Sequence, residues 1–546
     1  MRATLVLLIA MALAPYAGGT AVAQDLQPAP PHDLVWIQAV GAALDETVAG
    51  VVVDASGDIL TAGHFSGTVT FGLPPDAITL TAHGGRDVFV TRQDVRGRLL
   101  WAKHVGGTGS TSIGTHRSLA SGWDGSLYLT GFFSGTTDFD PGAGTSLLSA
   151  LGNSDAFLMR LSSDGDLTWV HQFGAPGETA YPLAVAAGGI YVYMVGYCDG
   201  PIDFDPGPGS SIVGNPDFFM SFTVKLYDVG LFLWARGGDY EAANQAVAAD
   251  GEGNVYVAGT GGRLTKFTSG GLYDWYHYFG GGILALAVDE AGDVYAGGFA
   301  PPSPYTGRVF KVDSDGNTLW SRVLGGPGES LVITLLLGDG DEMYIAGRFG
   351  GTANLSLSIA PEASLTSAGL TDAFVTRLTR SGQFSWTQRM GGTAPDETRA
   401  VALDATGRLY VTGIFRGTAD FDGGPGTLNR TSAGGADGFV ARYGTHGVLL
   451  EGTAPTLIHF DAAGVSPTFD VVTGLLSQLV ADRTFGSADC LARFNGSPGI
   501  DPSTPPLGDG FYYLARAVTC CGMQEYGSSV LYPDPREDLA LANPCP

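Results

Sequence analysis

Three short acidic segments contain the residues of this sequence best suited to bind a metal ion. Each has two aspartates on either side of a phenylalanine, with glycine close behind: Asp138-Phe139-Asp140, Asp203-Phe204-Asp205 and Asp420-Phe421-Asp422. Carboxylates at positions i and i+2 of an extended strand share one face, and calcium takes several oxygen ligands from flexible segments of this kind. The six aspartates are therefore calcium candidates. In the alternative, they accept hydrogen bonds from backbone N–H groups of a turn.

A second set of acids stands just before each predicted inner strand. Its members include Glu46, Glu178, Glu241, Glu329 and Glu397. If they faced the centre of a closed fold, they would form a ring able to bind a cation. Repetition in several units favours a structural role instead, because function on repeat scaffolds usually breaks the symmetry.

Four of the five cysteines lie near the end of the chain and suggest disulfides. Cys490, Cys520, Cys521 and Cys545 allow three pairings. We expect Cys490 to pair with Cys520 or Cys521, and Cys545 with the other, while Cys198 is a buried free thiol. Adjacent Cys520 and Cys521 also suggest a quinone-dependent oxidoreductase, but they fall outside the repeats described next. The nine histidines show no metal-ligand spacing, and there is no Walker A or G-x-S-x-G motif. The sequence thus predicts no catalytic residue and no cofactor other than calcium.

These residues are set in a repeat that extends over most of the chain. A tryptophan followed by a short strand and glycines recurs at intervals of 41 to 68 residues, at Trp36, Trp101, Trp169, Trp234, Trp275, Trp320 and Trp386. Each copy also contains a Val-Asp-x-x-Gly-x-x-Tyr-Val-x-Gly segment and an Asp-Ala-Phe-Val-x-Arg segment, or variants of them. Each unit therefore predicts four short strands. Glycine makes up 83 of 546 residues and charged residues only 15%, as expected for many strands joined by tight turns. The repeat predicts an all-β fold, a seven-bladed β-propeller.

The two ends of the repeat region indicate how the ring closes. Residues 34–40 contain the first Trp strand without strands of their own before them, and the last unit reaches residues 448–451 without a Trp. The N-terminal strand is therefore expected to complete the last blade, which removes the open sheet edges. The predicted propeller covers residues 34–452.

The units resemble the bacterial β-propeller repeats called SBBP repeats. The strings that carry the resemblance are Trp-x-x-x-x-Gly-Gly, Val-Asp-x-x-Gly-x-x-Tyr-Val-Thr-Gly, Gly-Thr-x-Asp-Phe-Asp and Asp-Ala-Phe-Val-x-Arg-Leu, across roughly residues 34–450. The fourth and fifth units lack Asp-Phe-Asp, and the third has Ala187 in place of the hairpin Asp. The resemblance implies an exported or surface-exposed propeller and no particular reaction.

Residues 453–546 differ from the repeats. They contain the predicted strands 457–461, 468–474 and 511–519 together with the four late cysteines. The segment resembles the fibronectin type III-like C-terminal domains of secreted bacterial proteins, which implies a small β-sandwich with disulfides.

The first residues predict export. Arg2 precedes an apolar stretch over residues 3–14, and Ala21-Val22-Ala23 forms a cleavage site before Gln24. We assign residues 1–23 to a signal peptide and 24–33 to a linker. No later segment has the roughly 20 apolar residues of a membrane-spanning helix.

The charge balance narrows the choice of partners. There are 28 Lys and Arg against 54 Asp and Glu, a net charge of −26, and such a surface repels nucleic acids and anionic membranes. The sequence predicts a secreted or cell-surface, monomeric, non-enzymatic binding or scaffold protein whose propeller loops bind a protein or glycan. The alternatives are a secreted polysaccharide hydrolase or lyase acting at the channel mouth, and a calcium-dependent adhesin.

Overall fold

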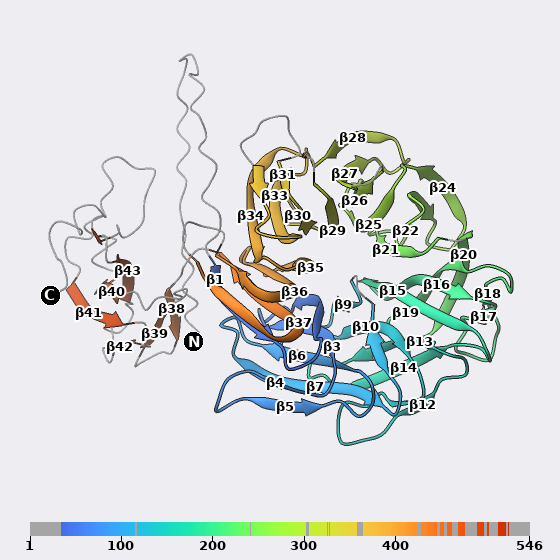
Figure 1. Ribbon diagram of the computed structural model, residues 1–546, viewed down its shortest axis with the longest axis horizontal. Coiled ribbons are helices and arrows are strands. Elements are labelled where there is room, and N and C mark those ends of the chain that lie inside the picture. Colours follow the sequence, from blue (N-terminus) through green and yellow to red (C-terminus); the bar gives the residue numbers. More distant parts are fainter. Residues whose placement is uncertain are drawn as a thin grey trace, which may run out of the picture.

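The computed structural model describes most of the repeat region and part of the tail (Figure 1). The described residues are 34–444, except 115–116, 241, 302–304, 325, 327, 357–363 and 423–426, and the tail strands given below. The predicted signal peptide and linker, Cys520, Cys521 and Cys545 lie outside them. Within these ranges the regular elements are all strands, and no helix there is long and apolar enough to cross a membrane.

The main body consists of antiparallel sheets in which strands adjacent along the chain pair with one another. The first two sheets are β2 (Thr47–Val53), β3 (Ile59–Phe65), β6 (Asp87–Gln93) and β7 (Leu99–Gly107), then β8 (Thr111–Ile113) with β9 (Leu119–Ser121), β10 (Leu127–Phe133), β13 (Asp155–Leu161) and β14 (Leu167–Phe173). The next two are β15 (Thr179–Gly188), β16 (Tyr191–Asp199), β19 (Met220–Tyr227) and β20 (Phe232–Tyr240), then β21 (Asn244–Ala249), β22 (Val255–Gly259), β23 (Arg263–Phe267) and β24 (Tyr273–Tyr278). The others are β25 (Gly282–Val288), β26 (Val294–Ala300), β27 (Thr306–Val312) and β28 (Thr318–Val323), then β29 (Ser330–Leu337), β30 (Glu342–Phe349), β33 (Asp372–Thr379) and β34 (Phe384–Gly392), and finally β35 (Glu397–Leu403), β36 (Leu409–Asp420), β37 (Asn429–Tyr443) and β1 (Leu34–Val40).

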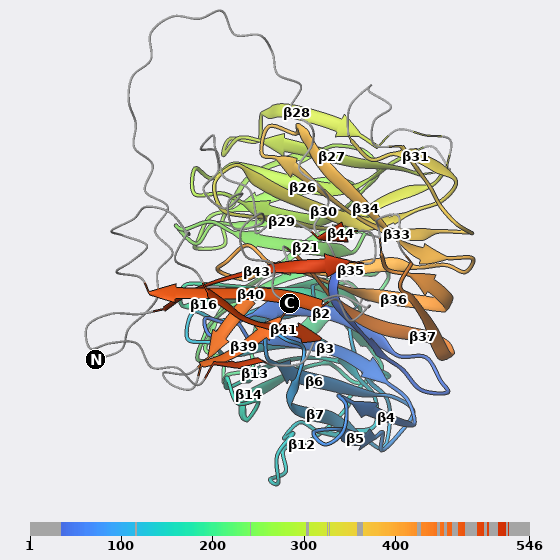
Figure 2. The same cartoon turned by 90° about the vertical axis from the view of Figure 1, so that its left-hand side faces the viewer.

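The sheets form a ring around a centre. The first strand of each sheet contacts the first strands of both neighbouring sheets, and these contacts run from β2 through β9, β15, β21, β25, β29 and β35 back to β2. Figure 1 shows this circular arrangement face-on, and Figure 2 shows it from the side, with β5 and β12 at the lower rim and β28 at the upper rim. The all-β, propeller-type architecture predicted from the repeat is therefore confirmed.

Short hairpins extend the sheets where the chain carries its insertions. They are β4 (Thr68–Phe71) with β5 (Ile78–Thr81), β11 (Thr136–Asp138) with β12 (Leu147–Ser149), β17 (Ile202–Asp203) with β18 (Ile212–Val213), and β31 (Thr352–Asn354) with β32 (Ser364–Thr366). In the last sheet the long strands β36 and β37 continue into the same extension.

The N-terminal strand closes the last sheet. β1 pairs antiparallel with β37 from Leu34 opposite Tyr443 to Val40 opposite Gly438. Beyond it, Asp45 Oδ1 accepts a hydrogen bond from the backbone N–H of Ala436 at 2.8 Å. This pairing is the one expected for residues 34–40.

The tail begins earlier than the repeat pattern suggested. β38 (Val448–Glu451) was expected to end the last repeat, but it pairs with β39 (Thr456–Phe460), which in turn pairs with β42 (Gly499–Asp501). A second sheet contains β40 (Thr468–Leu475), β41 (Asp489–Asn495), β43 (Phe511–Thr519) and β44 (Gly522–Met523). Because β1 already occupies the outer edge of β37, β38 is free to pair with the tail.

The repeated tryptophans join neighbouring sheets. Trp36 on β1 donates its indole N–H to the carbonyl of Val95, in the β6–β7 turn of the adjacent sheet, at 3.2 Å. Trp275 does the same to Ser314 at 2.9 Å, and three other tryptophans make the equivalent bond: Trp169, Trp234 and Trp320. These tryptophans thus act as links between sheets, in agreement with the structural interpretation.

Candidate functional site

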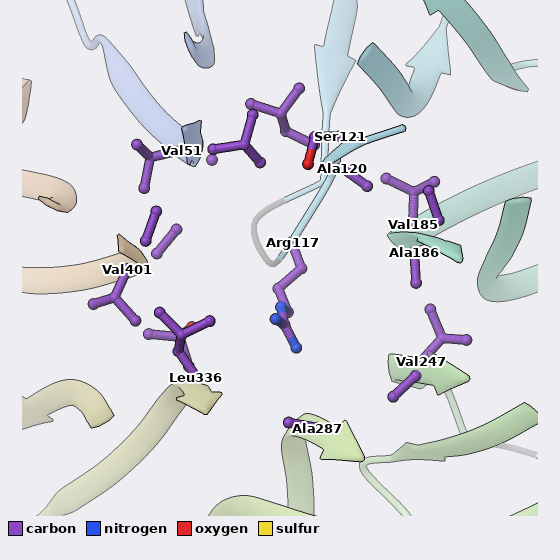
Figure 3. Close-up of a pocket in the computed structure, with 18 of the residues that line it drawn as sticks. Val51, Arg117, Ala120, Ser121, Val185, Ala186, Val247, Ala287, Leu336 and Val401 are labelled. Atoms are coloured by element: carbon purple, nitrogen blue, oxygen red, sulfur yellow. The ribbon is translucent and has the colours of Figure 1, made fainter. Parts of the chain in front are cut away.

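The centre of the ring is a cavity with a volume of about 370 Å³ (Figure 3). Its wall is made by the inner strands of the sheets, through residues such as Val51, Val185, Val247 and Val401. Small and β-branched side chains suit these positions, because the inner strands converge here and leave little space for larger groups. Volumes of this size are typical of small-ligand sites.

Arg117 is the one charged side chain among the described residues that line this cavity. It lies between β8 and β9, in the sheet whose inner strand is split into two pieces, and its side chain points into the middle of the ring (Figure 3). Its backbone φ is +41°, whereas every other positive φ in the described chain belongs to glycine. Residues held in this region of backbone space are strained and cluster at functional sites.

The contacts of Arg117 leave its charge without a counterion. Nη1 donates a hydrogen bond to the carbonyl of Leu286, across the cavity, at 2.5 Å. No carboxylate within the described ranges forms an ion pair with it, and burial lowers the pKa of its guanidinium below the ordinary value. Arg117 is half-buried. Arginine nevertheless stays protonated in proteins, and a charge withdrawn from water without a counterion is costly. An anion that enters the cavity would provide that partner.

The predicted ring of acids is divided between local bonds and ion pairs. Glu46 Oε2 accepts the backbone N–H of Ala42 at 2.8 Å, which is a structural bond of the expected kind. Glu329 and Glu397 instead form ion pairs with the two terminal nitrogens of the Arg348 guanidinium, Nη2 at 3.0 Å and Nη1 at 2.8 Å. Glu241 lies outside the described residues. Glu46, Glu329 and Glu397 are therefore each bound by neighbouring groups. Glu178, the other described member of the set, lies just before β15.

The three acidic hairpins lie in three different sheets and share one geometry. In the first, Asp138 Oδ1 accepts backbone N–H bonds from Asp140 and Ser146, at 3.0 and 2.8 Å. Asp203 and Asp420 repeat this pattern, and Asp205 accepts the N–H of Gly207 just as Asp140 accepts that of Gly142. Asp422 lies at the corresponding position of the last hairpin. One carboxylate oxygen of each first aspartate thus fixes the turn. Calcium binding by these six residues stays a prediction.

The phenylalanines between the paired aspartates anchor the hairpins to the sheets. Phe139 is fully buried, with its ring centroid 5.1 Å from that of Phe133 and 5.0 Å from that of Phe157. Phe204 and Phe421 are buried in the same way. The alternation of Asp and Phe therefore places acids at the surface and an aromatic ring in the core, as the period of a strand requires.

Cys198 is fully buried in β16, as expected, and burial raises the pKa of its thiol to about 12. Such a thiol is chemically inert at neutral pH. Cys490 lies in β41, and the other three late cysteines lie outside the described residues, so the disulfide pairing stays a prediction.

Sequence reasoning missed Arg117, although the sequence contains a signal for it. Each of the other inner strands is one continuous strand, whereas the segment from Gly114 to Arg117 interrupts this one. An interruption of one repeat in an otherwise regular series marks a departure from symmetry, which on repeat scaffolds is where function is expected.

Comparisons with known proteins give limited matches. No protein-family model matches the chain. The regulatory protein FlaEY of Caulobacter vibrioides is 29% identical over 194 residues, which are 35% of this chain and 19% of FlaEY. The match thus spans about a fifth of that protein. Among solved structures, the WD40 β-propeller domain of Doa1 aligns with 76% of this chain and 96% of its own, with 11% identity and a TM-score of 0.38.

Proposed function

We propose that this chain is an exported, non-enzymatic binding or scaffold protein that acts as a monomer at or outside the cell surface. Its partner is a protein or a glycan, and a carboxylate-bearing group of that partner enters the central cavity and pairs with Arg117. In this proposal the body is a seven-bladed propeller of SBBP-type repeats, followed by a fibronectin type III-like module with disulfides. The signal-like segment 1–23 supports the export, and the inner-strand ring supports the blade count.

The observation that carries the proposal is the guanidinium of Arg117 in the central cavity, where the described residues provide a backbone carbonyl but no counterion. A guanidinium presents a planar fork of donors that matches the two oxygens of a carboxylate. The inner strands surround the guanidinium on several sides and withdraw it partly from solvent, so the electrostatic attraction is stronger there than at a fully exposed site. The chain as a whole carries a net charge of −26, which makes a cationic centre a selective feature rather than part of a general basic surface.

The test uses two acidic probes with neutral counterparts. Tetragalacturonate and a tetraglutamate peptide are titrated into the full chain by calorimetry, beside a neutral galactose tetramer and a tetraglutamine peptide. We expect one acidic probe to bind at a single site and its neutral counterpart to bind at least about tenfold more weakly, because a charge-assisted hydrogen bond is lost. Arg117→Gln should weaken the acidic probe by a similar factor. Arg322→Gln, at an exposed arginine of β28, is the matched control.

Equal binding of acidic and neutral probes, or unchanged binding by folded Arg117→Gln, would overturn the cavity assignment. Whether the glycan or the peptide binds decides between the two partner classes.

The two alternatives predict different outcomes. A polysaccharide hydrolase or lyase would shorten the oligogalacturonate during the titration, which mass spectrometry of the probe would detect. A calcium-dependent adhesin would bind its ligand in calcium and release it in chelator, and it would require Asp138, Asp203 and Asp420.

A further inference from the structure

Two histidines and an aspartate meet on the first sheet, outside the central cavity. His83 lies in the turn that leads into β6, Asp87 is the first residue of β6, and His104 lies on the paired strand β7. The His83 Nδ1 and His104 Nε2 atoms are 3.4 Å apart. They lie 3.9 and 3.8 Å from the same oxygen, Asp87 Oδ2. Among the described residues this is the one group of three or more His, Cys, Asp or Glu side chains close enough to hold a metal ion.

The two imidazoles lie at the long limit of a hydrogen bond to one another, and their separations from the carboxylate match the needs of a metal better than those of hydrogen bonds. Distances of 3.8 and 3.9 Å from imidazole nitrogen to carboxylate are too long for hydrogen bonds. Zinc binds nitrogen and carboxylate oxygen at about 2.0 to 2.2 Å, so neighbouring ligand atoms in a tetrahedral site lie about 3.4 Å apart. The two imidazoles already have this separation. The two carboxylate edges need to shorten by only about half an ångström, which small rotations of the His83 and His104 side chains provide.

The burial of the three groups suits an open metal site. The Asp87 side chain is fully buried, His104 is 23% exposed and His83 is 63% exposed. Asp87 Oδ2 accepts the backbone N–H of His83 at 2.9 Å, which leaves another lone pair of that oxygen for a metal. A metal bound to this carboxylate on its buried side would keep a coordination position facing solvent.

Other sheets have residues at the positions equivalent to His83, Asp87 and His104, and these residues show which members of the group recur. Asp155 and Asp372 take the place of Asp87 in their own sheets, and each accepts a backbone N–H from four residues earlier. Gln172 and Arg389 take the place of His104, and each bonds to its aspartate, at 2.6 and 2.7 Å. The aspartate is therefore part of the repeat.

The histidines are particular to the first sheet. The turn position of His83 is Leu151 in the second sheet and Ala368 in the sheet of Asp372. Two imidazoles have thus been added at the two positions from which a side chain can reach the repeated carboxylate. In those two sheets, the side chain of Gln172 or Arg389 alone bonds to the aspartate, and the turn residue contributes only its backbone N–H. A structural role for the aspartate therefore does not require a histidine at either position.

We propose that His83, Asp87 and His104 bind a divalent transition-metal ion of the zinc class, with a fourth position open to water or to a ligand atom of a partner. Two imidazoles and one carboxylate are ligands that zinc prefers, and the two imidazole nitrogens argue against calcium, which takes oxygen ligands. The site is independent of the cavity and of the calcium candidates.

The experiment measures zinc binding by the full chain, purified without a histidine tag and freed of metal by chelator. Zinc chloride is titrated by calorimetry, and Co²⁺ is used in parallel as a spectroscopic probe of coordination. We expect one zinc ion per chain at this site. His104→Gln reproduces the Gln172–Asp155 pair, so it should preserve the fold while weakening zinc binding at least about tenfold, since even loss of an outer-shell partner commonly has that effect. His83→Ala should do the same, and His277→Ala, at an exposed histidine of β24, is the matched control.

A second variant tests the geometry by construction. Leu151→His combined with Gln172→His places the same two imidazoles around Asp155, so the zinc stoichiometry should rise by one. The proposal is overturned if wild type binds no zinc, or if folded His83→Ala and His104→Gln bind it as tightly as wild type, as they would if the tail cysteines were the ligands.

Discussion

Aspartates recur at equivalent turns of several sheets, and their contacts show why they repeat. Asp404 Oδ1 accepts backbone N–H bonds from Thr406 and Arg408, at 2.8 and 3.0 Å, and so closes a hairpin. The same arrangement occurs in other sheets at Asp54, Asp94, Asp250, Asp289 and Asp313. Each carboxylate offers several acceptor sites to a turn that has surplus donors. Much of the acidic excess is thus part of the fold.

A different aspartate explains the glycines that follow the Trp strands. Asp87 is buried against Gly106, where an added Cβ would lie 2.0 Å from the nearer carboxylate oxygen. Gly174 stands in the same relation to Asp155, and Gly41 to Asp437. The glycines that follow the Trp strand and the aspartate that begins the Asp-Ala-Phe-Val segment are far apart in the sequence of each unit. They are therefore two halves of one structural contact.

This contact predicts a large penalty for Gly106→Ala. The new methyl group collides with the Asp87 carboxylate, which is fixed by the turn, so we expect a loss of about 2 kcal/mol or more in the free energy of unfolding. Gly251→Ala is the matched control, because nothing lies within 4 Å of an added Cβ there and its φ is not positive. Thermal melting checks both variants. Equal melting temperatures would show that the Asp87 turn yields to the methyl group.

At the scale of the element, the strands were largely predictable, because each repeat marks its own turns and apolar runs. The predicted segments 468–474 and 511–519 correspond to β40 and β43, and residues 34–40 form β1 as expected. Contacts between elements were harder to predict. His83 and His104 come from a turn and a strand that meet only through the pairing of β6 with β7, so no linear spacing marks the cluster. One inner strand is split into β8 and β9, which brings Arg117 into the cavity. The segment from Gly114 to Arg117 marks this split in the sequence, although the repeat pattern did not predict it.

The closing strand β1 is the element whose loss should affect the fold most. Trp36 packs against Tyr410 of its own sheet, with ring centroids 6.3 Å apart, and bonds to Val95 of the next sheet. Without β1, the outer edge of β37 would be an unpaired edge.

Trp36→Ala is therefore expected to lower the free energy of unfolding by about 2 to 4 kcal/mol, within the range for loss of a large packed side chain. Trp123→Ala is the comparison, since that side chain is 73% exposed. Denaturant unfolding of both variants measures the difference. If Trp36→Ala were as stable as Trp123→Ala, closure through β1 would contribute little.

At the scale of the whole molecule, closure of the ring buries acids next to other acids, and this raises their pKa values. Glu46 lies where the first and last sheets meet, and burial, aided by the charges of Asp437 and Asp45, raises its pKa to about 7. Burial likewise raises the pKa of Asp396 to about 7, near Asp372. In this chain of net charge −26, closure of the ring brings carboxylates close together, and they repel one another when ionised. Protonation of one of them removes that repulsion.

The raised pKa of Glu46 makes the stability of the folded chain depend on pH. Its folded pKa lies above the unfolded value of 4.5, so the folded state holds a proton that the unfolded state releases. The stability contributed by this proton is fully present below pH 4.5 and is lost as the pH rises through 7. Burial lowers the pKa of His64 to about 3, which acts in the opposite direction below pH 6.5. The variant must therefore be compared with wild type at each pH.

Glu46→Gln is the suitable substitution, because a glutamine oxygen can still accept the N–H of Ala42. Both oxygens of Asp396 accept backbone N–H groups, so an asparagine there would add a structural defect. We expect Glu46→Gln to raise the melting temperature by about 2 to 4 °C at pH 8 and to leave it nearly unchanged at pH 4.5. Melting curves of both proteins at half-unit intervals between these values should show the two diverging as Glu46 ionises in wild type. A constant offset across this range would mean that Glu46 keeps the same charge in the folded and unfolded chains, and that the closure of the ring is insensitive to pH.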